Sequence, residues 1–180
     1  MAEYDRGLVL LAIARESIVR GDDAAPCAAW EHGWLREHGA SFVTLRLDGD
    51  LRGCIGSVDA RRPLGDDVAR NAHAAAYRDP RFPPVSTGEL LHLQVEVSVL
   101  SPREALPAAS ESEALARLRP GVDGIALEYG AASATFLPQV WESLPAPEAF
   151  LDALRHKAGL PARFWHPELR LSRYTVEKYA

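Results

Sequence analysis

The sequence has few cysteines, little lysine and no long apolar run. Only Cys27 and Cys54 are cysteines among its 180 residues, so a disulfide-stapled scaffold is excluded and a reducing compartment is favoured. No apolar run approaches the ~18 residues that a membrane span needs, and no apolar segment follows the charged N-terminus. We therefore expect a soluble, cytoplasmic protein that does not insert into membranes.

Familiar catalytic signatures are also missing. The chain has no phosphate-binding loop and no dinucleotide-binding fingerprint, and its cysteines and histidines lack the spacing of zinc or iron–sulfur ligands. The net charge of −5 argues against a nucleic-acid partner, although Gly53-Cys54-Ile55-Gly56 matches a weak G-x-x-G pattern of RNA-binding loops. We predict no metal site and no cofactor.

Periodicity and turn signals predict an α+β fold. Helical spacing is expected over residues 3–20, 30–38, 64–79, 112–119 and 147–158, and strand patterns over 41–47, 51–58, 93–100, 124–129, 132–137 and 169–179. Asp48-Gly49-Asp50 lies between two of the strands and is typical of a hairpin turn. These elements predict a mostly antiparallel sheet flanked by helices. We expect a single domain over residues 1–180, with a second, smaller lobe packed closely against the larger one.

The most informative segment is Leu51–Gly56, which places a cysteine between two glycines in a predicted strand. Glycines inside a strand mark a bulge, a bend or a close approach to the backbone, so Gly53 and Gly56 are candidate binding positions. Alternation along a strand places Cys54 on the same face as Arg52, and a nearby guanidinium favours the thiolate. We predict Cys54 and Arg52 as catalytic residues. The alternative is a small buried cysteine in a tight sheet.

A second cluster follows the helix predicted over residues 64–79. Asp79-Pro80 ends this helix, and Arg81 is followed by a rigid pair of prolines that can hold a cation in a fixed place. Asp79 and Arg81 are therefore candidate binding residues, and a turn stitched by their ion pair is the alternative. Gln139 is a further candidate that could face a cleft, with capping or solvation as its alternative.

Thiol chemistry also needs a group that accepts the proton of the cysteine. His73 lies on the predicted helix before Asp79, and Glu96 lies on the polar side of the alternating strand 93–100. We predict these two side chains as proton-transfer partners of Cys54. Both also have ordinary structural explanations, as a packed histidine and as a solvated strand residue.

Together these blocks resemble a known family, the AMMECR-type domain, called AmmeMemoRadiSam system protein A in bacteria. The resemblance is carried by Leu51–Gly56, Asp79–Val85, Gly124–Gly130, Ala134–Trp141 and Lys157–Pro161, and it spans nearly the whole chain. It implies an α+β fold with a larger and a smaller lobe and a cleft near the hexapeptide. It also implies a Memo-like protein and a radical-SAM protein as partners, but no assigned reaction.

Two functional hypotheses follow. In the first, the protein is an enzyme or enzyme component that uses Cys54 in a cleft on a small molecule or a modified peptide. In the second, Leu51–Gly56 is a structural docking surface of a binding or adaptor module that engages the Memo-like or radical-SAM partner. A homodimer is compatible with either.

Overall fold

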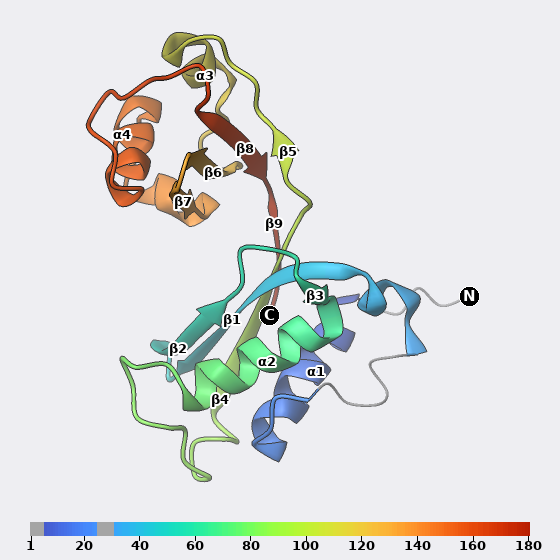
Figure 1. Ribbon diagram of the computed structural model, residues 1–180. Helices are drawn as coiled ribbons and strands as arrows, with labels where there is room; N and C mark the ends of the chain where they lie inside the picture. Colours follow the sequence, from blue (N-terminus) through green and yellow to red (C-terminus); the bar gives the residue numbers. More distant parts are fainter. Residues whose placement is uncertain (1–5, 25–30) are drawn as a thin grey trace. The chain divides into compact units, whose positions relative to one another are not determined.

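The computed structural model describes residues 6–24 and 31–180, so Cys27 lies outside the described residues. The chain divides into two compact units, the first comprising Met1–Leu100 with Glu177–Ala180 and the second Ser101–Val176 (Figure 1). Each unit combines α-helices with its own antiparallel sheet, and the predicted α+β class is confirmed. Among the described residues, no helix combines the length and the apolar character needed to cross a membrane.

The first unit contains a five-stranded sheet in which β2, β1, β4 and β9 are neighbours in that order and β3 pairs with β1. Its strands are β1 (His38–Leu47), β2 (Asp50–Gly56), β3 (Arg62–Pro63), β4 (Leu93–Leu100) and β9 (Val176–Tyr179). Strands β1 and β2 form the hairpin predicted around Asp48-Gly49-Asp50, and β2 is left at the edge of the sheet. The hexapeptide therefore lies in an edge strand.

Helices α1 (Arg6–Arg20) and α2 (Leu64–Tyr77) cover one face of this sheet (Figure 1). Alternate residues of β1 and β4, such as Val43 and Val97, are fully buried with the apolar side chains of both helices. The residues between them point to the opposite side of the sheet because side chains alternate along a strand. We call that side the far face; it carries Phe42, Thr44, Cys54, Glu96 and Ser98.

The second unit has a four-stranded sheet in the order β5, β8, β6, β7. Its elements are β5 (Glu104–Ala105), α3 (Glu111–Arg117), β6 (Gly124–Tyr129), β7 (Ala132–Phe136), a 3-10 helix η3 (Pro138–Glu142), α4 (Pro147–Lys157) and β8 (Arg170–Tyr174). In its core, the rings of Trp141 and Phe150 stack with their centroids 3.7 Å apart. The Trp141 Nε1–H donates to the carbonyl oxygen of Asp123 at 2.7 Å, so the buried indole is satisfied.

Two predicted elements differ from the structure. The strand expected over 169–179 is split near Thr175 into β8, which joins the second sheet, and β9, which joins the first. The helix expected over 30–38 is reduced to a short 3-10 helix η2 (Gly33–Arg36), and β1 already begins at His38. In both places the local pattern indicated ordered backbone, whereas pairing with distant strands determined its form.

Candidate functional site

Cys54 lies in the middle of β2 and faces Thr44 of β1 across the ladder. Its Sγ is 3.3 Å from the Thr44 Oγ1, and the cysteine is half-buried. The backbone N–H and C=O of Cys54 bond to groups on the side away from β1. Cys54 and Thr44 are therefore a non-hydrogen-bonded pair of the ladder, the kind in which opposing side chains approach most closely. The sulfur is therefore held on the far face by a hydroxyl neighbour.

The backbone of Cys54 is fixed by the segment that follows α2. Its N–H donates to the Asp79 Oδ2 at 2.9 Å, and its carbonyl accepts from the Arg81 Nη2 at 3.2 Å. The two partners are ion-paired with each other, the Arg81 Nη2 lying 2.6 Å from the Asp79 Oδ2. This pair occupies backbone groups at the sheet edge that would otherwise be open to another strand.

The same contacts shift two pKa values. The side-chain hydrogen bond from Arg81 is the main cause that holds the pKa of Asp79 below its usual range, with help from the backbone N–H of Cys54. The pKa of Arg81 is raised chiefly by its hydrogen bond to Asp79, and Cys54 adds a smaller Coulombic contribution. Arg81 is therefore close enough to Cys54 for the two to interact electrostatically.

Arg52 is directed elsewhere because β2 contains a bulge. Leu45 pairs with Gly53 and Arg46 with Leu51, which leaves Arg52 as the extra residue between them. Its Nε donates to the Glu89 Oε1 at 2.7 Å and its Nη2 to the Pro84 carbonyl at 3.4 Å. The expected Arg52–Cys54 pairing is thus replaced by an ion pair with Glu89, and the guanidinium beside Cys54 is that of Arg81.

Gly53 and Gly56 both lie at close approaches. A Cβ on Gly53 would lie 2.2 Å from the Ala75 carbonyl oxygen, so this glycine lets β2 contact the backbone of α2. A Cβ on Gly56 would lie 2.2 Å from atoms of the Phe42 ring, which covers this glycine. Of the features predicted for these glycines, the structure shows close approaches: Gly53 contacts the backbone of α2, and Gly56 contacts an aromatic ring.

Glu96 shares the far face with Cys54, but Thr44 lies between them. Thr44 pairs with Cys54 on one side and with Glu96 on the other, so the two residues are two strands apart, about 10 Å. The Glu96 carboxylate is 2.8 Å from the Lys178 Nζ of β9. A pocket of about 320 Å³ adjoins Glu96 and is also lined by Arg15, Arg46, Gln94, Val95 and Ala180.

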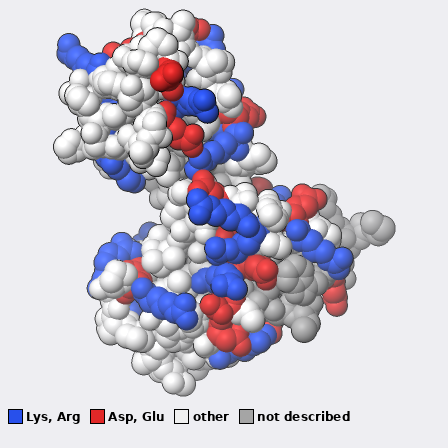
Figure 2. All heavy atoms as spheres, in the orientation of Figure 1, with Lys and Arg blue, Asp and Glu red and all other residues white. Residues whose placement is uncertain are grey.

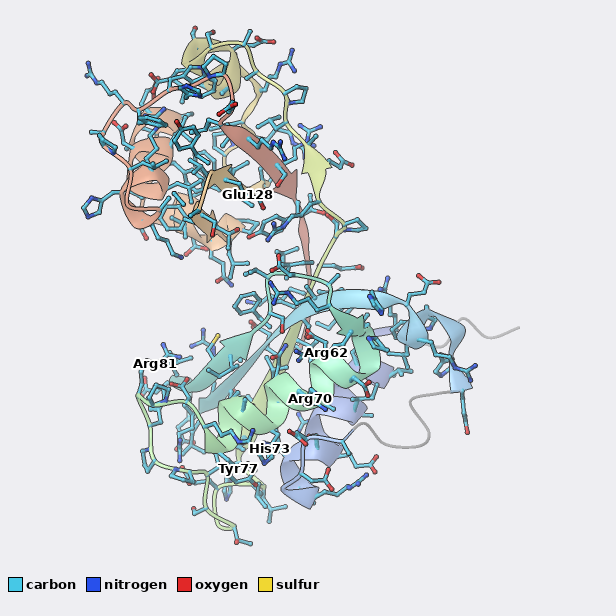
Figure 3. All side chains as sticks on the ribbon, in the orientation of Figure 1. Arg62, Arg70, His73, Tyr77, Arg81 and Glu128 are labelled. Carbon is cyan, nitrogen blue, oxygen red and sulfur yellow. The ribbon has the colours of Figure 1, made fainter. Side chains whose placement is uncertain are left out.

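His73 lies on α2, on the opposite side of the sheet from Cys54. Its ring packs against that of Tyr77 at 5.1 Å between centroids, and the Tyr77 hydroxyl donates to the Ile18 carbonyl of α1 at 2.7 Å. Figure 3 shows both residues on α2, whereas Arg81 lies beside β2. The sheet therefore separates His73 from the sulfur.

Gln139 belongs to the second unit, where it is an exposed residue of the 3-10 helix η3. The structure therefore groups the predicted site residues by unit. Eight of them, Arg52, Gly53, Cys54, Gly56, His73, Asp79, Arg81 and Glu96, belong to the first unit, and Gln139 belongs to the second.

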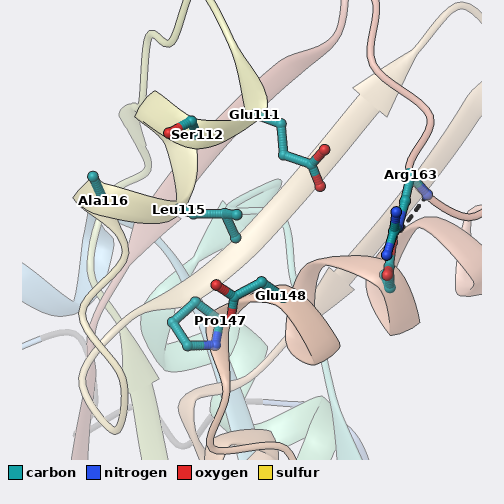
Figure 4. A pocket seen from close by; sticks show the side chains of 8 residues that line it. Glu111, Ser112, Leu115, Ala116, Pro147, Glu148 and Arg163 are labelled. Atoms are coloured by element: carbon teal, nitrogen blue, oxygen red, sulfur yellow. Dashed lines mark hydrogen bonds between the residues drawn. The ribbon is translucent and has the colours of Figure 1, made fainter.

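The second unit has a pocket of its own, of about 560 Å³, between α3 and α4 (Figure 4). Glu111, Glu148, Asp152 and Arg163 line it together with apolar residues such as Leu115. The fully buried Arg155 underlies this region and bonds the Glu111 and Asp152 carboxylates at 2.7 and 2.6 Å. The Glu111–Arg155 pair thus joins α3 to α4, whereas the Asp152–Arg155 pair lies within α4.

Charged side chains of both signs are interspersed over each unit on the surface drawn in Figure 2. Among the described residues, no group of three or more histidine, cysteine, aspartate or glutamate side chains is arranged to hold a metal ion. The groups available for chemistry near the hexapeptide are the Cys54 thiol, the Thr44 hydroxyl and the Glu96 carboxylate on the far face, and the Arg81 guanidinium.

Comparison with known proteins identifies the family. The AMMECR1 family model matches residues 11–179 of the chain. The chain belongs to the AMMECR1 family. This result confirms the resemblance carried by the hexapeptide and the later sequence blocks.

AMMECR1 relatives occur in archaea and bacteria. A protein of Methanothermobacter thermautotrophicus is 40% identical, over 96% of this chain and 93% of its own length. One of Thermotoga maritima is 38% identical, over 90% and 86%. The crystal structure of the uncharacterised protein PH0010 from Pyrococcus horikoshii matches with a TM-score of 0.76 at 32% identity, covering 95% of this chain and 87% of that one.

Sequence reasoning missed three residues that shape the AMMECR1 site. Thr44 contacts the sulfur, Glu89 neutralises Arg52, and Lys178 pairs with Glu96. Thr44 could not be found by pairing the hairpin strands about their turn, because the bulge at Arg52 shifts the register and a simple count would place Val43 opposite Cys54. Glu89 and Lys178 are contributed by a loop and by a distant strand, and the local pattern carried no signal for them.

Acidic pH should lower the stability of the first unit against unfolding. The pKa of Glu89 is lowered to about 2, chiefly by the hydrogen bond from Arg52 and then by the backbone and hydroxyl of Ser86. A carboxyl with a depressed folded-state pKa stabilises the fold above its unfolded value, near ~4, and that contribution is lost as the pH falls through the folded value. Asp79 acts in the same direction. The urea concentration at the midpoint of unfolding should therefore decrease as the pH is lowered from 5 to 2.5.

Glu89→Gln is the matched test of this pH dependence. It removes the titrating group while keeping the size of the side chain, so the urea midpoint should vary less over the same pH range. An equal slope in the variant and the parent protein would show that the Arg52–Glu89 pair is not a source of acid sensitivity.

Proposed function

We propose that the protein is the thiol-bearing component of an AmmeMemoRadiSam-type system and uses Cys54 on a small molecule or a modified peptide. The observation that carries this proposal is the placement of the sulfur. It is half-buried on the far face, bonded to Thr44, and its backbone is fixed on both sides by the Asp79–Arg81 pair. A nucleophile held in one position meets its substrate with little orientational cost.

The neighbours of Cys54 suit nucleophilic chemistry. A thiol is an intrinsically strong nucleophile, and the Arg81 guanidinium, which bonds the Cys54 carbonyl, adds a positive charge beside it. Water is the proposed proton acceptor, because Glu96 lies about 10 Å from Cys54 and is paired with Lys178, and His73 lies on the other side of the sheet. Thr44, whose hydroxyl contacts the sulfur, would fix the orientation of the Cys54 side chain.

The second candidate is an adaptor module that docks the Memo-like or radical-SAM partner. It is favoured by one specific observation: the hydrogen-bond partner of the Cys54 Sγ is the neutral Thr44 hydroxyl rather than a base. In that role the two ion pairs Asp79–Arg81 and Arg52–Glu89 would hold the segment after α2 against β2 as a rigid recognition surface.

Alkylation by iodoacetamide at pH 7 tests the thiol proposal. Mass spectrometry of the peptide that contains Cys54 separates its reaction from that of Cys27. We expect Cys54 in the folded protein to react about tenfold faster than in the urea-unfolded chain, because the Arg81 guanidinium beside it stabilises the negative charge of the departing iodide. Thr44→Val is the matched control, since it removes the hydroxyl and keeps the shape, and it should change this rate.

A folded-state rate at or below that of the unfolded chain would reject the nucleophile. If Cys54→Ser also retained capture of the Memo-like and radical-SAM proteins, the adaptor role would stand in its place. Loss of capture on Cys54→Ser in a folded protein would instead argue against a purely structural sulfur.

A further inference from the structure

Arg81 has an unused donor beside Cys54. Its Nε and Nη2 bond the Asp79 carboxylate at 2.9 and 2.6 Å, and Nη2 also reaches the Cys54 carbonyl at 3.2 Å. Within the described part of the chain, none of its hydrogen bonds uses Nη1. The Arg81 side chain as a whole is 52% exposed.

The ion pair presents its positive end to solvent. The Asp79 side chain is only 2% exposed, whereas half of the Arg81 side chain is accessible. A molecule that approaches Cys54 along the edge of β2 therefore meets the guanidinium before the carboxylate. The guanidinium also lies over the Phe82 ring at 5.4 Å, a contact that limits its orientation.

The other cations of the site are less suited to this role. Arg52 is 11% exposed and is paired with Glu89. Lys178 is paired with Glu96. Arg81 is therefore the cation of this group that combines contact with the Cys54 backbone and a half-exposed side chain.

We infer that the electrophile attacked by Cys54 carries a carboxylate, and that the Nη1 of Arg81 binds it. This inference rests on the proposed thiol chemistry and names its substrate class. A monoanion is favoured over a phosphate dianion, because a single free nitrogen is available and Asp79 already neutralises part of the charge.

The bond changes balance without any co-reactant beyond the substrate. The Cys54 sulfur forms a bond to the electrophilic carbon, and the electron pair of the bond that breaks leaves with the displaced group or moves onto a carbonyl oxygen. The thiol proton passes to water. With iodoacetate as the probe, the new bond is S–CH₂ and the leaving group is iodide.

The test compares iodoacetate with iodoacetamide, two reagents of similar size that differ in charge. The ratio of their alkylation rates at Cys54 is measured in the folded protein and referred to the urea-unfolded chain. We expect this relative ratio to be about threefold in favour of iodoacetate, the size expected for one screened charge pair near a surface. Added salt should reduce it, because the guanidinium is exposed.

Four variants assign the effect. Arg81→Gln should abolish the preference for the anion, and Arg81→Lys, which keeps the charge, should retain most of it. Asp79→Asn should increase the preference to about tenfold, because it removes the opposing charge and keeps an acceptor for the Cys54 N–H. Arg61→Gln removes a distant exposed charge and should leave the ratio unchanged.

The outcomes separate the two proposals. A Cys54 that resists both reagents in the folded protein would overturn the thiol chemistry and this inference with it. A reactive Cys54 with no anion preference would overturn the carboxylate inference alone. A preference that disappears in Arg52→Gln but persists in Arg81→Gln would overturn the assignment to Arg81.

Discussion

Replacing Gly53 with alanine is expected to destabilise the first unit by about 3 kcal/mol, at the upper end of the cost of overpacking a well-filled interface. The added Cβ would lie 2.2 Å from the Ala75 carbonyl oxygen and 3.0 Å from its carbonyl carbon. Both are backbone atoms inside α2, so neither can rotate out of the way. Either β2 or the helix must move, and Cys54 would move with the strand.

Gly56→Ala is the matched control in the same strand. Its Cβ would lie 2.2 Å from both Cγ and Cδ1 of Phe42, so this half-buried side chain must leave its rotamer; because no helix backbone has to move, we expect a smaller cost of about 1 kcal/mol. Urea unfolding followed by circular dichroism measures both variants. A Gly53→Ala protein as stable as Gly56→Ala would show that close strand–helix contact is not the reason for this glycine.

Asp67→Ala is expected to be comparably destabilising, by about 3 kcal/mol, because it strands buried donors. Asp67 is 1% exposed and accepts from the Ser41 N–H and hydroxyl at 2.9 and 2.8 Å. It also accepts from the Ser57 hydroxyl at 2.8 Å and the Asn71 amide at 2.9 Å. Removing this charged acceptor leaves the buried Ser41 N–H and hydroxyl without an acceptor, whereas Asn71 keeps its bond to the Ser41 carbonyl.

Asp66→Ala provides the comparison for this network. Asp66 lies in the same first turn of α2 but is half-buried and outside the network, so only the favourable interaction with the helix N-terminus is lost, about 0.5 kcal/mol. Equal losses in the two variants would mean that the helix terminus, rather than the network, accounts for the effect of Asp67.

The Asp67 network has a consequence for the site. Ser57 directly follows the hexapeptide, and its hydroxyl bonds Asp67 of α2. At the other end of the hexapeptide, the Arg52–Glu89 pair holds the loop after α2. The segment with Cys54 is thus tied to the same helix and its following loop at both ends, so we expect little movement of the sulfur.

The sequence alone was enough for the hairpin of β1 and β2, the strand β4 and the helix α2. Each depends on neighbours in the chain: an Asp-Gly turn, the alternation over 93–100, and acidic residues in a first helical turn. The hexapeptide was also recognisable, because two glycines around a cysteine are unusual in a strand. These features single out the candidate site.

The direction of the side chains was decided by tertiary structure. The bulge at Arg52 interrupts the alternation of β2, and Glu89 attracts the guanidinium from a loop 37 residues away. His73 was a reasonable proton acceptor in sequence, but the sheet lies between it and Cys54. Neither a bulge nor the separation of two faces leaves a periodic signal that local reasoning can read.

What the sequence by itself determined is the set of elements and the segment that carries the thiol, because helices and hairpins are encoded by residues close together in the chain. What only the tertiary structure decided is which charge accompanies that thiol. Ion pairs form between side chains brought together by strand pairing and helix packing, so Arg81 rather than Arg52 became the neighbour of Cys54.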